Sequence, residues 1–395
     1  MRKLILSLLL ILGGIATAVP SRAAEELRIG ISQYPTTLHP SREASVAKSY
    51  IAAMTRRPMT VYDQQWELVC MLCTELPLIE AGTAIPEDLP PGVEGAGNGR
   101  GIRMKYTIQP GATWGDGTPV TTRDVLFTWK AGRHPTAGIG NLELYRRTFA
   151  IDVVDDKTFW LHYDRITFEY AAINDFRILP AHIEEPIFDA SPEDYRNRTA
   201  FDTDPTNKAL YFGPYRIVEV VPGSRVVLER NDTWWGKRPV FDRITVLIIE
   251  KTTALEANLL SGNIDMIAGE LGLTLDQALA FEKRHGDKYN VIYEPGLLYE
   301  HIDLMLDNPI LQDKRVRQAM VYAIDREAIS QKLFEGRQPV AHSGVSPLDW
   351  VYDPDIKKYN YDPAKAAELL DAAGWTELRG GIRHNAAGEP LPLEF

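Results

Sequence analysis

Hydrophobic and polar residues alternate most clearly after the Gly213-Pro214 turn. Residues 215–221 alternate as one strand, Pro222-Gly223-Ser224 reverses the chain, and residues 225–229 return as the partner strand. A loop with Trp234 and Trp235 then leads to a third strand over residues 244–249. The pattern therefore predicts a hairpin closed by an aromatic clasp, in which both tryptophans are structural.

The two periodicities of strands and helices recur along the rest of the chain. Thr121, with Asp124 three residues later, fits a carboxylate form of the capping box and predicts a helix through Lys130. Strands that alternate with helices are typical of a mixed α/β protein. Further strands are predicted at 26–32, 102–109 and 264–267, with a last one opening at 390–395. Further helices are predicted at 45–54 and 254–261, the latter capped by Thr252 and Thr253 and ended by Gly262.

Residues 78–101 are rich in proline and glycine. They match neither spacing of a phosphate-binding loop, G-x-G-x-x-G or G-x-x-x-x-G-K-[ST], and no strand–turn–helix pattern surrounds them. We therefore expect a mobile surface insert.

The N-terminus has the pattern of an export signal. Arg2-Lys3 precedes the apolar residues 4–12, and small residues follow. The apolar run to Val19 spans about 24 Å as a helix, less than the roughly 30 Å hydrocarbon core of a bilayer. Residues 1–24 are thus predicted to be a cleavable signal peptide, cut after Ala18 or, as we favour, after Ala23. No cysteine for a lipid anchor lies near either point, so a free periplasmic protein is expected.

Composition excludes some classes of partner. The chain has 395 residues and a formal net charge of −11, which disfavours nucleic acid because phosphate contacts dominate that affinity. Cys70 and Cys73 are the two cysteines. In an exported chain an oxidised structural pair is favoured over a redox motif, because the flanking residues are acidic and apolar. Two cysteines without a nearby histidine cannot form a zinc site, and no metal or other cofactor is expected.

An enzyme is the first rival class. Neither G-x-S-x-G nor H-E-x-x-H is present, and the eight histidines are scattered. Asp155-Asp156 and Glu184-Glu185 are adjacent carboxylates, but neighbouring side chains point apart on a strand or helix. No catalytic residue is predicted.

Four segments together resemble a known family. Residues 211–242 are similar to its GPYxxxxxxPGxxxxLxRNxxYWxxxP block, and residues 114–125 to its W-x-D-G-x-P-[VF]-T-x-x-D-V segment. Residues 312–319 are similar to its D-x-R-V-R-Q-A helix start, and residues 362–375 to its D-P-x-x-A…L-L-x-x-A-G-[WY] helix. The chain is identified as a member of the family 5 extracellular solute-binding proteins, the receptors of ABC importers.

The resemblance implies a type II periplasmic binding protein fold, with mixed sheets flanked by helices in hinged lobes. Lobe I would consist of residues 25–57 and 151–300, lobe II would be the insertion 58–150, and lobe III would be residues 301–395. Because family members continue further, we expect a C-terminally truncated chain in which lobe III is incomplete.

The resemblance also implies a ligand and its site. The lobes would close around a peptide, and the receptor would act as a monomer that delivers it to a permease complex in the inner membrane. Alternative ligands within the family are nickel chelates, haem, opines and oligosaccharides, and a non-functional remnant is a further alternative. The positions that match ligand-lining segments are Gln33, Tyr34, Pro35 and Thr36 in one loop, Gly269 in a second, and His301 and Asp303 in a third.

Overall fold

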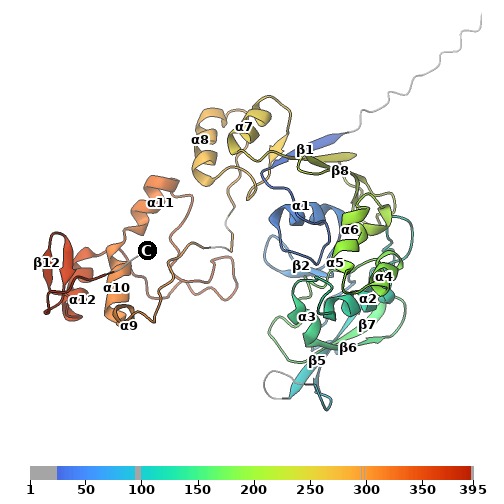
Figure 1. Ribbon diagram of the computed structural model, residues 1–395, viewed down its shortest axis with the longest axis horizontal. Coiled ribbons are helices and arrows are strands. Elements are labelled where there is room, and N and C mark those ends of the chain that lie inside the picture. The colour runs from blue at the N-terminus through green and yellow to red at the C-terminus, as the bar shows by residue number, and fades with distance from the viewer. Residues whose placement is uncertain (1–24, 94–98, 295, 298, 393–395) are drawn as a thin grey trace, which may run out of the picture.

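The computed structural model describes residues 25–93, 99–294, 296–297 and 299–392. The predicted signal peptide therefore lies outside the described residues. Figure 1 shows that the elements form two groups. We call described residues 25–291 the main body, which holds both large sheets, and residues 309–392 the C-terminal group, which is mostly helical. Residues 292–308 are the linker between them.

A five-stranded sheet with the order β11-β1-β10-β9-β8 forms one end of the main body. β1 runs parallel to both β10 and β11, whereas β8, β9 and β10 are antiparallel neighbours. All five strands lie within or next to predicted ones. They are β1 (Glu26–Ile31), β8 (Tyr215–Val221), β9 (Arg225–Arg230), β10 (Arg243–Ile248) and β11 (Met266–Ile267).

The predicted hairpin and its aromatic clasp are both present. Gly223 has a φ of +68°, the left-handed conformation that the turn requires and that glycine adopts without strain. The Trp235 ring stacks on Phe212 with centroids 6.3 Å apart, and the Arg57 guanidinium lies 4.9 Å from the centroid of Trp234. The tryptophans thus join the hairpin to neighbouring segments.

A four-stranded antiparallel sheet with the order β4-β5-β7-β6 forms the other half of the main body. Its strands are β4 (Ala84–Asp88), β5 (Arg100–Thr107), β6 (Thr148–Val153) and β7 (Thr158–Tyr163). The prediction of a mobile insert at 78–101 is wrong for β4, which pairs with β5; residues 94–98 lie outside the described residues. The predicted lobe boundary between 150 and 151 falls inside β6, and the lobe boundaries stay predictions.

Helices cover the sheets of the main body. α2 (Thr122–Arg133) starts as predicted, with the Asp124 carboxylate accepting the Thr121 backbone N–H at 2.8 Å. α7 (Thr252–Leu260) begins two residues earlier than predicted, because Lys251 and not a threonine is its N-cap. The remaining elements are α1 (Val46–Thr55), β2 (Thr60–Tyr62), β3 (Leu68–Cys70), α3 (Leu142–Arg147), α4 (Ala181–Ala190), α5 (Tyr195–Arg198), α6 (Ala200–Thr203), η1 (Lys208–Leu210) and α8 (Leu275–His285).

The cysteines form the expected disulfide, which joins Cys70 at the end of β3 to Cys73. Cys73 is fully buried and forms an antiparallel bridge with Ile108, next to β5. The disulfide therefore fastens the β2–β3 hairpin to the four-stranded sheet.

The C-terminal group is built around α10 and α12, which pack against each other. Its elements are α9 (Pro309–Gln312), α10 (Lys314–Ala323), α11 (Arg326–Phe334), α12 (Pro363–Ala372), β12 (Glu377–Arg379) and β13 (Ile382–His384). The predicted strand at 390–395 is described only over residues 390–392, where a single β-bridge joins Pro390 to His384.

Candidate functional site

The carboxyl ends of β1 and β11 bring two of the three predicted ligand segments together. These strands are parallel, with Gly30 opposite Ile267. Beyond the strands, Ala268 N–H donates to the Gly30 carbonyl at 3.1 Å, and Ser32 N–H donates to the Leu271 carbonyl at 2.8 Å. The loop from Gln33 and the segment around Gly269 therefore leave the sheet side by side.

The main chain of residues 33–36 has hydrogen-bonding capacity to spare. Among the described residues, no other main-chain group bonds the backbone N–H or carbonyl groups of these four residues. Gln33 and Thr36 are exposed, Tyr34 is half-buried and Pro35 is buried. Unpaired backbone groups in a loop can form main-chain hydrogen bonds with an extended ligand.

Gly269 lies just beyond β11 in the second segment, and its carbonyl accepts the Gly272 N–H at 2.9 Å. It is exposed, and a Cβ built at this position would have the Tyr50 hydroxyl, 3.6 Å away, as its near neighbour. Burial, followed by the negative charge of Glu270, raises the pKa of Tyr50. Tyr50 thus stays a neutral donor beside Gly269. The sequence analysis missed it, although its place on the amphipathic helix α1, close to the end of β1 in the chain, was the available signal.

Asp202 fixes the far end of the 33–37 loop. Its carboxylate accepts a hydrogen bond from the Thr37 hydroxyl at 2.8 Å and from the Leu38 N–H at 3.1 Å, and it pairs with Arg42 at 2.6 Å. Burial and the charge of Asp202 raise the pKa of Tyr34. Nothing in the local sequence of Asp202 marks this role, because its partners lie far away in the chain.

A buried polar network underlies the loop. His39 is fully buried. Ser41 N–H donates to His39 Nδ1 at 3.2 Å, which leaves the proton on Nε2, 3.3 Å from the Tyr195 hydroxyl. Tyr195 in turn donates to Glu184 at 2.5 Å. Burial, with the positive charges of Arg56, Arg42 and Lys48, lowers the pKa of His39 well below 6.5. His39 is thus a neutral structural support for the loop.

Lys48 closes this region from α1. Its ammonium donates to the carbonyls of His39, at 3.0 Å, and of Arg42 and Glu43. Burial is the main cause that lowers the pKa of Lys48, to about 8. An ammonium group has three N–H donors, and in Lys48 each of them has a carbonyl acceptor. Lys48 therefore holds the loop in place and has no donor left for a ligand.

The third predicted segment lies in the linker. His301 Nε2 is 3.2 Å from Asp303 Oδ1. Both are exposed, and the His301 ring stacks on Tyr299 with centroids 4.6 Å apart. Within the described residues, neither side chain has a hydrogen bond or ion pair with residues 33–37 or Gly269.

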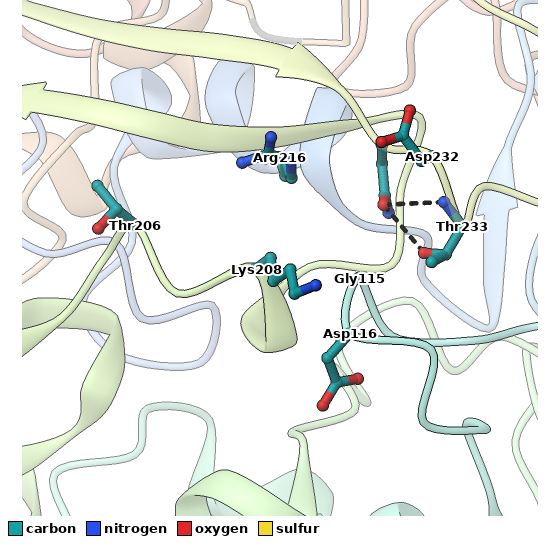
Figure 2. A pocket seen from close by; sticks show the side chains of 8 residues that line it. Gly115, Asp116, Thr206, Lys208, Arg216, Asp232 and Thr233 are labelled. Carbon is teal, nitrogen blue, oxygen red and sulfur yellow. Dashed lines mark hydrogen bonds between the residues drawn. The ribbon is translucent and has the colours of Figure 1, made fainter.

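A separate hollow lies where the turn at Gly115-Asp116 meets the loop at 231–233 (Figure 2). Its volume is about 370 Å³. Thr233 Oγ1 lies 2.9 Å from Asn231 Oδ1 and 3.0 Å from the Trp114 carbonyl, so it ties the two segments together. The lining residues include two acids and two bases and none of the predicted ligand positions. They are Gly115, Asp116, Thr206, Lys208, Arg216, Asn231, Asp232 and Thr233.

A sheet whose parallel strand ends carry unpaired loop backbone, with a second group of elements on a linker, is the architecture of a solute-binding receptor. The family model for bacterial extracellular solute-binding proteins, family 5 Middle, matches residues 100–395. The chain belongs to this family.

Known proteins agree with this assignment. The oligopeptide-binding protein AppA of Bacillus subtilis is 28% identical over 289 residues, which are 71% of this chain and 50% of AppA. The oligopeptide binding protein of Thermus thermophilus, solved with a pentapeptide, is 26% identical with a TM-score of 0.66, over 93% of this chain and 66% of that one. NikA of Brucella suis, solved with Fe(III)-EDTA, is 21% identical with a TM-score of 0.69, over 93% and 68%.

The chain spans about half the length of the curated relatives it matches. The predicted mixed α/β fold of periplasmic binding proteins is confirmed. In the described ranges, each helix is too short or too polar to cross a bilayer.

Proposed function

We propose that the chain is a receptor that binds peptides and delivers them to the permease complex of an ABC importer. The observation that carries this proposal is the free main chain of residues 33–36 beside exposed Gly269. An extended peptide that lies along these two loops pairs with both segments through its own main chain. Such pairing provides affinity without reading side chains.

The surrounding groups suit a peptide. The absence of a side chain at Gly269 allows close approach of a ligand backbone. The Tyr34 and Tyr50 hydroxyls, whose pKa values are raised by burial, are protonated and supply hydrogen-bond donors. The third segment, with His301 and Asp303, would reach the ligand only when the C-terminal group closes on the main body, through a change in the linker.

The cellular location is proposed from the N-terminal sequence and from the family. The export pattern at the N-terminus and the extracellular character of the family favour a periplasmic protein that is released from its signal peptide. The receptor would act as a monomer, and the ligand would leave chemically unchanged.

The ligands named for related structures define the alternative to a peptide, which is a metal chelate. The Thermus thermophilus protein holds a pentapeptide, whereas NikA holds Fe(III)-EDTA. The carboxylates of a metal chelate only accept hydrogen bonds, so they can use free backbone N–H groups but not free carbonyl groups, whereas a peptide main chain can pair with both. The free backbone at residues 33–36 therefore favours the peptide.

The test is titration calorimetry and thermal unfolding of the purified protein with peptides of two to nine residues and with Fe(III)-EDTA. A ligand at 100 times its Kd stabilises the folded state by about 2.7 kcal/mol. We expect at least one peptide class to raise the melting temperature. No shift with any peptide, or a shift with the chelate alone, contradicts the proposal.

A substitution series at Gly269 locates the site. Gly269→Ala and Gly269→Val place a Cβ in ordinary contact with Tyr50, so the ligand-free melting temperature should stay unchanged. We expect peptide affinity to fall stepwise, by about tenfold or more for valine, because the side chain blocks the approaching main chain. Unchanged affinity in Gly269→Val would place the ligand elsewhere.

A further inference from the structure

Among the described residues, two contacts between the main body and the C-terminal group stand out. Near the linker, α8 meets the end of α11 through two ion pairs, Lys283 with Glu335 and the half-buried Glu282 with Arg337. Exposed ion pairs contribute little to stability because water screens them. These contacts sit where a hinge would be, since the linker starts a short way after α8 in the chain (Figure 1).

The second contact is aromatic and lies far from the first in sequence. Phe168, in the loop after β7, stacks on Trp350 of the C-terminal group, with centroids 5.1 Å apart and planes at 28°. Among the described side chains, no other aromatic pair joins the two groups. Yet Phe168 is 76% exposed and Trp350 is 74% exposed. Each ring therefore presents most of its surface to solvent, and the contact can open without exposing a core.

The main body holds Phe168 ready for this contact. Its neighbour Glu169 accepts a hydrogen bond from the Tyr62 hydroxyl at 2.7 Å, which fastens the loop to β2. Burial raises the pKa of Tyr62 to about 12, and the hydrogen bond to Glu169 and the negative charges of Glu169 and Asp349 add to this shift. The hydroxyl therefore remains a donor. Asp349 precedes Trp350, and its influence on Tyr62 places the C-terminal loop beside the same patch.

We propose that Phe168 and Trp350 form a latch that holds the C-terminal group in the present arrangement, before the receptor closes. The inference rests on the proposed function, because closure matters only for a receptor that binds between moving parts. The latch touches no predicted ligand position. It acts by favouring the arrangement before closure, so its loss strengthens the binding of every ligand that requires closure by the same factor.

The first experiment examines the contact without a ligand. The eight tryptophans are replaced by 5-fluorotryptophan, and Trp350→Phe identifies the resonance of residue 350 in fluorine NMR. Phe168→Ala should shift this resonance, because the ring of Phe168 lies against it. Val240→Ala, an equally exposed apolar site on the main body, is the control and should leave it in place. A Trp350 resonance that is identical in Phe168→Ala and the wild type overturns the proposal.

The second experiment measures binding of tetra-alanine and of Fe(III)-EDTA by titration calorimetry. An aromatic pair of this kind corresponds to a change of about two- to tenfold in the closing equilibrium. Phe168→Ala and Trp350→Ala should each strengthen the binding of whichever probe binds by that factor, and Val240→Ala should leave it unchanged. Affinities equal to that of the control overturn the latch. If the wild type binds neither probe, the proposed function fails on its own, and the NMR experiment still decides the contact.

Discussion

In the main body, helices cover two sheets, and aromatic side chains such as Trp114, Tyr106 and Phe159 are fully buried. In the C-terminal group, α10 packs on α12, but the buried apolar side chains among its described residues are Leu311, Val316, Ala319 and Ala366. Hydrophobic stabilisation grows with the apolar area removed from water. The main body is therefore stabilised by packing to a far greater degree than the C-terminal group.

Helix caps show the opposite trend. Within the described residues of the main body, side chains cap α2, α6 and α8, whereas α1, α3, α4, α5 and α7 begin without a side-chain cap. In the C-terminal group, side-chain oxygens accept a backbone N–H at the start of all four described helices, α9 to α12. Where packing is weak, local hydrogen bonds thus carry a larger share of helix stability.

The largest expected effect is in the core of the main body. Phe159 on β7 is fully buried and stacks on Tyr106, with centroids 5.8 Å apart. Phe159→Ala should lower the free energy of unfolding by about 3–5 kcal/mol, because it leaves a cavity. The matched control is Phe168→Ala, the same change at an exposed site, with an expected effect within about 0.5 kcal/mol. Urea unfolding measures both, and equal losses would contradict the description of the core.

The next largest effect is a pH dependence of stability, which arises in the buried network around His39. The pKa of folded His39 is lowered well below 6.5 by burial and by Arg56, Arg42 and Lys48. The unfolded chain therefore takes up a proton near pH 6.5 that the folded protein does not. Stability is full above that pH and falls below it, by at most about 1.4 kcal/mol per pH unit for one group.

Urea unfolding between pH 7.5 and 5 tests this dependence. His39→Asn removes the titrating group, so its free energy of unfolding should fall less steeply with decreasing pH than that of the wild type. Parallel curves for the two proteins would show that His39 is not the group responsible.

The contrast between the two groups also explains how much could be predicted from the sequence. The hairpin of β8 and β9 was predictable because its turn is set by local residues, Pro222 and Gly223. β4 was missed because its sequence, Ala-Ile-Pro-Glu-Asp, lacks alternation, and Pro86 argues against a strand. The structure tolerates Pro86 because β4 is an edge strand, bonded on one side only.

The candidate site, like the fold, could be predicted only in part. The loop at 33–36 and Gly269 were predicted from resemblance, and the parallel pairing of β1 with β11 places them together. Asp202, which anchors this loop, and Trp350, which meets Phe168, could not be predicted. Each depends on a contact between segments far apart in the chain, and local patterns carry no information on such contacts.

The smallest expected effect is at a cap of the C-terminal group. The Asp362 carboxylate accepts the Lys365 N–H at 2.9 Å at the start of α12. Asp362→Ala should weaken this helix by about 1 kcal/mol, which corresponds to roughly fivefold faster amide exchange over residues 363–372. Asp355→Ala, an exposed loop site in the same group, is the control and should leave exchange unchanged. If both variants exchange at the wild-type rate, packing against α10 is sufficient to hold α12, and the contrast between a packed main body and a capped C-terminal group is wrong.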